Sequence, residues 1–109
     1  MPQKTDPLVE IKGFMASRVI LTACELDIFT ALHGQSSSAQ ELALTRSCDL
    51  RCLTRLLDCL VTQGLLAKDS QGHYSLTAQS EPLSAEHAET QLPMAMHLSH
   101  VWNNWHMLT

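Results

Sequence analysis

Residues 49–66, DLRCLTRLLDCLVTQGLL, decide the fold of this chain. Apolar residues recur there every three or four positions, which is the spacing of an amphipathic helix. Asp49 is a good N-cap and Gly64 a good C′ residue, so the predicted helix covers residues 50–63. Its predicted core face consists of Leu53, Leu56, Leu57, Leu60 and Val61. One amphipathic helix has no core of its own, so the neighbouring segments must cover this face.

The segment after this helix reads LLAK, DSQG and HYSLT, which predicts a strand, a turn and a second strand. Tyr74 and Leu76 are expected on one face of that hairpin. The segment before the helix contains Ser38 and Glu41 at capping-box spacing, which predicts a short helix over residues 39–45.

Two helices followed by a hairpin are the usual order of a winged helix-turn-helix domain. The 109 residues suffice for one domain with one modest core. We therefore expect a single, mainly α-helical domain over residues 1–109, with the helix-turn-helix at 38–63 and a two-stranded β wing at 65–77.

The N-terminal region, residues 7–33, predicts a long helix and a short one. Asp6 is the expected N-cap of the long helix and Pro7 its first residue. Asp27 is expected to interrupt this helix and to cap a short helix over residues 28–33, which Gly34 ends.

The long N-terminal helix is apolar over most of its circumference. One side carries Leu8, Ile11, Met15, Val19 and Ala23, and another carries Phe14, Leu21, Cys24 and Ile28. Its polar residues form one narrow stripe of Arg18, Thr22 and Glu25. Such a helix must be covered from more than one direction, by a partner or by a larger core of the same chain. Because a larger core is hard to build from 109 residues, we favour a partner.

The last segment, residues 90–109, predicts another long helix, with Thr90 as N-cap and Pro93 in its first turn. Apolar residues follow one another there at spacings of four, three, four and three, which is a seam for another helix. The seam consists of Met94, Leu98, Val101, Trp105 and Leu108, and Trp102 widens it. The sequence stops without a C-cap, so we expect this helix either to continue in a longer protein or to fray at its end.

The charge balance argues against nucleic acid as the partner. The chain has 7 Lys and Arg against 11 Asp and Glu, a net charge of −4. The four charges of the central helix, Asp49, Arg51, Arg55 and Asp58, sum to zero, and we expect Arg55 to pair with Asp58. The wing has one lysine, Lys68. A winged-helix transcription regulator nevertheless stays an alternative, because the order of elements fits one.

Cysteine and histidine give weak signals of a site. The sequence has no export signal, so its four cysteines are expected to be reduced thiols in the cytoplasm. Cys52 and Cys59 are expected to be small buried side chains, and the absence of a CxxC pair argues against a zinc ribbon. His97 and His100 have a spacing that could hold a metal, and a metal-responsive regulator is a further alternative. No stretch is apolar enough to predict a membrane span.

The stretch GFMASRVILTACELDIFTAL, residues 13–32, resembles the first helices of the dimerisation domain of S-adenosylmethionine-dependent O-methyltransferases. SAQELAL, LTRLLDCLVTQGLL, HYSLT and VWNNWHML follow in the order of that family, so the resemblance covers nearly the whole chain. The family includes the caffeate and acetylserotonin enzymes.

The resemblance implies a homodimer in which helices of two subunits interlock. It also implies that catalysis occurs in a following domain, which binds S-adenosylmethionine through a glycine-rich loop. The four glycines of this chain are too far apart for such a loop, so we expect neither a catalytic nor a cofactor-binding residue here. The expected function is to hold two catalytic domains together and to help close the pocket for a hydroxylated small-molecule acceptor.

The resemblance also implies which residues reach that acceptor. Phe14, Met15 and Arg18 correspond to the helix that approaches the partner's pocket, and Met96 and His100 to the linking helix beside the chain's own pocket. Interface packing, a solvated charge and a surface histidine are the alternative roles of these side chains. The expected dimer interface consists of Ile11, Phe14, Met15, Val19, Leu98, Val101, Trp102 and Trp105.

Overall fold

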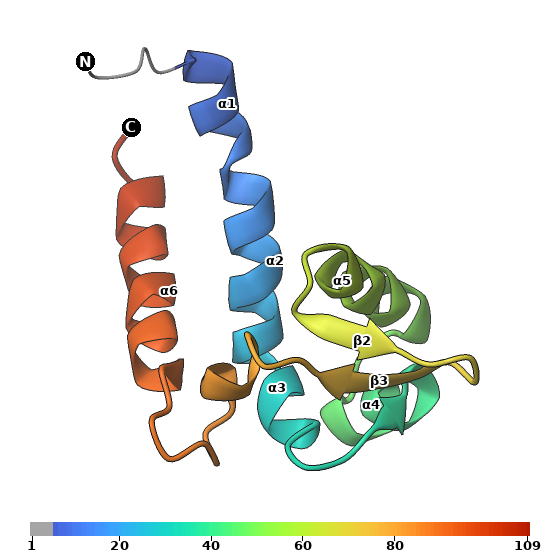
Figure 1. The fold of residues 1–109 in the computed structure, drawn as a ribbon. Coiled ribbons are helices and arrows are strands. Elements are labelled where there is room, and N and C mark those ends of the chain that lie inside the picture. The colour runs from blue at the N-terminus through green and yellow to red at the C-terminus, as the bar shows by residue number, and fades with distance from the viewer. Residues whose placement is uncertain (1–5) are drawn as a thin grey trace.

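The computed structural model describes residues 6–109, so the first five residues, on which the expectation of no export signal partly rests, lie outside the described part. Helices predominate and the sheet is small (Figure 1). The helices are α1 (Pro7–Lys12), α2 (Phe14–Glu25), α3 (Ile28–Ala31), α4 (Ala39–Arg46), α5 (Leu50–Thr62), the 3-10 helix η1 (Glu81–Leu83) and α6 (Leu92–His106). The strands are β1 (Ser37–Ser38), β2 (Leu66–Lys68) and β3 (His73–Leu76).

α1 and α2 together form one rod that projects beyond the rest of the domain (Figure 1). Asp6 caps it as predicted, because its carboxylate accepts from the Leu8 backbone N–H at 3.0 Å. The helix expected to be continuous is divided at Gly13, whose backbone stays in the right-handed helical region with φ −57°. Glycine is a weak helix former, which explains the break. Because the backbone of Gly13 stays helical, α1 and α2 keep nearly the same direction.

Asp27 interrupts the rod after α2 through a backbone conformation that the sequence did not predict. Its backbone is left-handed, with φ 58°, and its side chain makes no capping hydrogen bond to α3. The prediction that Asp27 interrupts the rod is confirmed, and Asp27 is the predicted N-cap residue of α3 by position, although its side chain does not cap. The left-handed turn carries the chain round a corner, since aspartate tolerates that conformation better than most residues.

The helix-turn-helix is formed by α4 and α5, and its local signals act as predicted. Ser38 and Glu41 make the reciprocal capping box of α4. The Asp49 carboxylate accepts from the Cys52 N–H at 2.9 Å at the start of α5. At the other end Gly64 has φ +77°, and the Leu65 N–H reaches the Leu60 carbonyl at 2.9 Å, which is the hydrogen bond of a Schellman motif.

The sheet has a third strand that the sequence did not predict. β2 and β3 form the expected antiparallel hairpin, and β1 pairs with the other edge of β3, Ser37 opposite Tyr74 and Ser38 opposite His73. The predicted two-stranded wing is confirmed as β2 and β3, and β1 is an unpredicted third strand of the sheet. β1 consists of two serines, and two residues are too few for the apolar alternation by which strands are recognised.

The core lies where the end of α2, α3, α4, α5 and the sheet meet. Its buried side chains are Ala23, Cys24, Ile28, Phe29, Leu32, Ala39, Leu42, Ala43, Leu53, Leu57, Leu60, Leu66 and Tyr74. Leu56 and Val61 pack at its edge, so the predicted core face of α5 is confirmed in outline. Cys52 and Cys59 are exposed, contrary to expectation, because each precedes a core leucine by one residue and so lies to the side of the core face of α5.

Asp58 on α5 pairs with the wing and not with Arg55. The Tyr74 hydroxyl donates to its carboxylate at 2.6 Å, and the Lys68 ammonium lies 3.3 Å from the same oxygen. The predicted Arg55–Asp58 pair is therefore wrong. The hydrogen bond from Tyr74, whose side chain is buried, instead connects the hairpin to α5.

The segment between β3 and α6 crosses under the rod and turns the chain back. The Ala85 N–H donates to the Thr30 hydroxyl at 2.9 Å, which anchors the segment to α3. α6 then runs antiparallel to α2, alongside it, so that the C-terminal end of α6 lies near the free end of the rod (Figure 1). Its N-cap is Gln91 and not Thr90, although the Thr90 hydroxyl accepts from the Leu92 N–H at 3.1 Å. No helix within residues 6–109 combines the length and the apolarity needed to cross a membrane.

Candidate interaction surface

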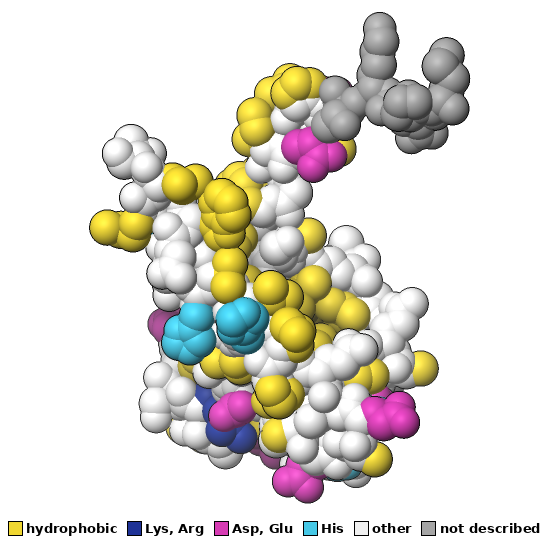
Figure 2. Space-filling model, turned by 90° about the vertical axis from the view of Figure 1, so that its left-hand side faces the viewer, with side chains coloured by type: hydrophobic (Ala, Val, Ile, Leu, Met, Phe, Trp, Pro, Cys, Tyr) yellow, Lys and Arg dark blue, Asp and Glu magenta, His cyan; other side chains and the backbone are white. Residues whose placement is uncertain are grey.

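The rod and α6 carry a large apolar surface outside the core. α1 has no buried residue, and the side chains of Phe14 and Met15 at the start of α2 are about half exposed. On α6, Leu98 is 50% exposed and Trp105 is 64% exposed. Hydrophobic side chains run along this face of the molecule onto the projecting end of the rod (Figure 2). An exposed apolar surface of this extent is typical of a protein-binding face. The exposed residues are Leu8, Val9, Ile11, Phe14, Met15, Met94, Leu98, Trp105, Met107 and Leu108.

A groove of about 400 Å³ runs between α2 and α6 within this surface. It is lined by Ser17, Ile20, Leu21, Ala95, Leu98, Val101, Trp102 and Trp105. The structure thus brings together the four interface residues predicted on α6. On the α2 side the lining residues, Ser17, Ile20 and Leu21, are not among the predicted interface residues.

The interface residues predicted on the rod lie outside the groove walls. Ile11, Phe14 and Met15 are exposed on α1 and the first turns of α2. Val19 is half buried and packs against the core of its own chain.

A polar network joins α2 to α6 beside the groove. The Ser99 hydroxyl of α6 donates a short hydrogen bond to the Glu25 carboxylate at the end of α2. The Arg18 guanidinium donates to the same carboxylate at 3.0 Å and to the Thr22 hydroxyl at 3.0 Å. Arg18 also lies over the Trp102 ring, 5.4 Å from its centroid, a cation–π contact back to α6.

The network lowers the pKa of Glu25 below its ordinary value of 4.5. The hydrogen bond from Ser99 is the main cause. Partial burial of the carboxylate opposes the shift, and the neighbouring Arg18 adds to it. Glu25 is therefore held as a carboxylate between the two helices.

The residues proposed to reach an acceptor are scattered along this surface. Phe14 and Met15 are exposed on the rod, and His100 is exposed on α6. Met96 is half buried against the core of its own chain. Arg18 is engaged by Glu25, Thr22 and Trp102, and only a third of its side chain is accessible.

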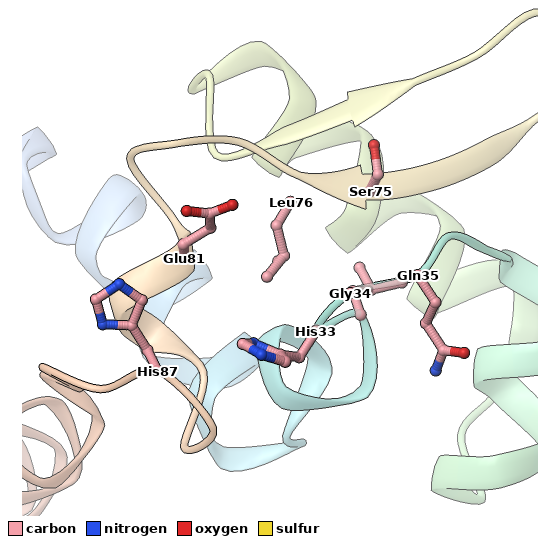
Figure 3. A pocket seen from close by; sticks show the side chains of 8 residues that line it. His33, Gly34, Gln35, Ser75, Leu76, Glu81 and His87 are labelled. Atoms are coloured by element: carbon pink, nitrogen blue, oxygen red, sulfur yellow. The ribbon is translucent and has the colours of Figure 1, made fainter.

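A second cavity, of about 390 Å³, lies at the opposite end of the domain from the free end of the rod. His33, Glu81 and His87 lie around it, and Leu76 reaches between them (Figure 3). The Nδ1 atom of His87 already accepts from the Glu89 N–H at 3.0 Å. Within residues 6–109 no three histidine, cysteine or acidic side chains are placed to hold a metal, so the metal site suggested by His97, His100 and a cysteine finds no third ligand there.

The environments of Cys24 and Cys52 do not favour nucleophilic chemistry. Burial raises the pKa of the Cys24 thiol to about 11, so it stays protonated at neutral pH. The pKa of exposed Cys52 is also raised, by its hydrogen bond to Asp49.

The face that would read DNA in a winged helix carries little free positive charge. Arg51 and Arg55 are exposed on α5. Lys68, the one lysine of the wing, is paired with Asp58 and lies 5.1 Å from the Tyr74 ring centroid. A basic wing that holds phosphates is therefore missing from the described hairpin, and the regulator alternative gains no support.

Comparison with known proteins gives a consistent result. The model of a family described as the O-methyltransferase dimerisation domain matches residues 10–86. A probable bifunctional dTTP/UTP pyrophosphatase/methyltransferase protein from Homo sapiens is 36% identical over 92 residues, which are 84% of this chain and 15% of that protein. The S-adenosyl-L-methionine-dependent methyl transferase PigF from Serratia sp. (strain ATCC 39006) is 31% identical over 85 residues, 72% of this chain and 24% of PigF.

The fold is also found in solved structures. A structure of PigF with SAH superimposes with a TM-score of 0.81 and 23% identity, over 99% of this chain and 36% of that one. The described chain thus spans a quarter or less of the length of the two curated relatives, and about a third of this solved chain.

Proposed function

The chain belongs to the family of O-methyltransferase dimerisation domains, and from that premise we propose that it joins two copies of a methyltransferase through the apolar surface of α1, α2 and α6. The observation that carries the proposal is α1, a six-residue helix with no buried side chain. Its apolar side chains Leu8, Val9 and Ile11 are each more than 60% exposed in the single chain, so we expect a second surface to cover them.

A second copy is the occupant that fits best. Two identical copies related by a twofold axis bury the same patch on each other. The rod of one copy then lies against the α2–α6 groove of the other, and the reverse contact follows by symmetry. The proposed interface is the one expected from the sequence, Ile11, Phe14, Met15, Val19, Leu98, Val101, Trp102 and Trp105, extended by the groove residues Ser17, Ile20 and Leu21.

In the parent protein we place the catalytic domain after the linking helix α6, so that residues 1–109 act as a dimerisation module without catalysis of their own. The relatives named above are methyltransferases, and one was solved with SAH. S-adenosylmethionine does not fit the described residues, because the sheet is wholly antiparallel and offers no glycine-rich loop at the carboxyl end of a parallel strand. The cofactor is therefore proposed for the parent only.

We further propose that the dimer helps to close the acceptor pocket of the parent enzyme on a hydroxylated small molecule. Phe14 and Met15 extend toward the second copy, and Met96 and His100 lie on the linking helix. Arg18 contributes indirectly in this proposal, because its guanidinium is already engaged. The proposed location is the cytoplasm, where the four free thiols would stay reduced.

The test of the proposal is the mass of the chain in solution, measured by light scattering at micromolar concentration. We expect the wild-type chain to have twice the mass of a single copy. Leu98→Glu, which puts a charge into the groove wall, should give a monomer that keeps its helix content by circular dichroism.

Leu44→Glu is the matched control, because Leu44 is 82% exposed on α4 and lies away from the groove. This variant should stay a dimer. A wild-type monomer, or a Leu98→Glu variant that is still a dimer, would refute the proposed interface.

A further inference from the structure

We propose that Glu25 is a positioning residue: through Ser99 and Arg18 it holds α6 on α2 in one rotational setting, and that setting decides which face of α6 is turned outward. The last clause rests on the proposed function, in which the outward face meets a second copy. The hold of α6 on α2 is a property of the single chain.

The burial pattern of α6 carries this inference. The one buried residue among the fifteen of α6 is a serine, Ser99, which is 5% exposed. The apolar side chains of Met94, Leu98 and Trp105 are each at least half exposed. Leu92, Ala95 and Met96 of α6 pack against the core of the domain, so the buried Ser99 adds a polar contact to an apolar one and leaves Met94, Leu98 and Trp105 outside.

A rotation of α6 by about one residue position, roughly 100°, would bring a different set of side chains onto α2. Leu98, which is half exposed in the groove wall, would then take the buried place of Ser99. The hydrogen bond between Ser99 and the Glu25 carboxylate is lost in that setting. The Glu25 carboxylate would keep its bond from Arg18 of the same helix but lose its bond to α6, so the Ser99 contact favours the observed setting.

Arg18 supports the same choice from the other side. Its guanidinium bonds Glu25 and Thr22 on its own helix and lies over Trp102 of α6. The basic side chains that face Glu25 are Arg18 from α2 and His100 from α6, and a positive charge on either one attracts the carboxylate. Two contacts on different turns of α6, at Ser99 and at Trp102, fix a rotation that one contact alone would leave free.

The experiment is hydrogen–deuterium exchange of the intact chain, followed by mass spectrometry of peptides, for wild type, Glu25→Ala, Ser99→Ala and the double variant. In either single variant we expect amides of residues 92–106 to exchange about tenfold faster, which corresponds to the loss of one charge-assisted hydrogen bond. Amides of residues 50–62 should keep their wild-type rates, which shows that the core is intact.

The double variant separates a specific contact from general damage. If Glu25 and Ser99 act through each other, the double variant should exchange no faster in residues 92–106 than the faster single variant. Glu89→Ala and Ser70→Ala are the matched controls, because both residues are exposed and lie outside the contact between α2 and α6. Both controls should exchange like wild type.

Unchanged exchange in residues 92–106 of both single variants would overturn the positioning role, and so would additive effects in the double variant. Light scattering on the same samples tests the proposed function separately. A wild-type monomer whose α6 amides respond to Glu25→Ala refutes the dimer and keeps the positioning role. A wild-type dimer whose α6 amides do not respond to Glu25→Ala supports the proposed function and refutes the positioning role.

Discussion

Tyr74 of β3 donates its hydroxyl hydrogen to the Asp58 carboxylate of α5 at 2.6 Å, across sixteen residues of sequence. The ring of Tyr74 is almost fully buried while its hydroxyl reaches a half-exposed carboxylate. Lys68 closes the group, because its ammonium contacts the same carboxylate at 3.3 Å. One acidic residue thus fastens both strands of the hairpin to α5, and it occupies the lysine that a DNA-binding wing would keep free.

The first prediction concerns this contact. Tyr74→Phe keeps the buried ring and removes only the hydroxyl, so we expect the free energy of unfolding to fall by about 1 kcal/mol in urea titrations. Asp58→Asn, which keeps the shape and removes the charge, should lose a similar amount. A Tyr74→Phe variant as stable as wild type would mean that Lys68 alone satisfies the carboxylate.

Local signals explain why so much of the helix-turn-helix was predictable. Asp49, Gly64, Ser38 and Glu41 each act on a backbone group within a few residues, and each acts as expected. The Tyr74–Asp58 bond and the strand β1 depend on partners far along the chain. No spacing rule reaches across that distance, so a short i, i+3 pair with Arg55 was the best available prediction, and it was wrong.

The second prediction compares the loss of stability caused by a leucine-to-alanine substitution in the core with that caused by the same substitution on the surface. Leu57 has no exposed surface and Leu44 is 82% exposed, and both are leucines on helices. Leu57→Ala should lower the free energy of unfolding by about 3 kcal/mol, because it removes buried methyl groups and leaves a cavity. Leu44→Ala should change it by less than about 0.5 kcal/mol. Equal effects in thermal or urea unfolding would contradict the position of the core.

The third prediction concerns the end of α5. A Cβ atom on Gly64 would meet only the Gln79 side chain, at 3.5 Å, so space is sufficient, and the left-handed backbone with φ +77° is the constraint. Gly64→Ala should therefore destabilise the domain by about 1–2 kcal/mol in urea titrations. Gly64→Asn should cost less, because asparagine tolerates this conformation. Equal losses in the two variants would indicate that packing around residue 64 sets the cost.

The interaction surface was only half predictable. The seam of α6 was read from a spacing, and Leu98, Val101 and Trp105 do lie together on the groove. Ser99 left no signal, because a serine inside a helix usually faces solvent. Its role depends on Glu25, 74 residues earlier. A sequence shows which face of a helix is apolar, but it does not show when a polar contact turns that face outward.

The fourth prediction is a pH dependence of α6. Because the pKa of Glu25 is lowered in the folded chain, its ionised form is the one that the fold stabilises. The stabilisation is complete above its ordinary value of 4.5 and is lost as the pH falls below that value through the folded pKa. We therefore expect amides of residues 92–106 to lose protection as the pH falls below 4.5, before the core unfolds, once the rates are corrected for the intrinsic effect of pH.

Other carboxylates also have lowered pKa values, notably Asp58, Asp49 and Asp69, so acid weakens the whole domain. The Glu25→Gln variant isolates the contribution of one group. Its α6 amides should be less protected than those of wild type at neutral pH, because glutamine lacks the charge that attracts Arg18. The difference between the two proteins should vanish in acid, where wild-type Glu25 is itself neutral. A difference that stays constant across this pH range would show that shape at residue 25, and not its charge, holds the two helices together.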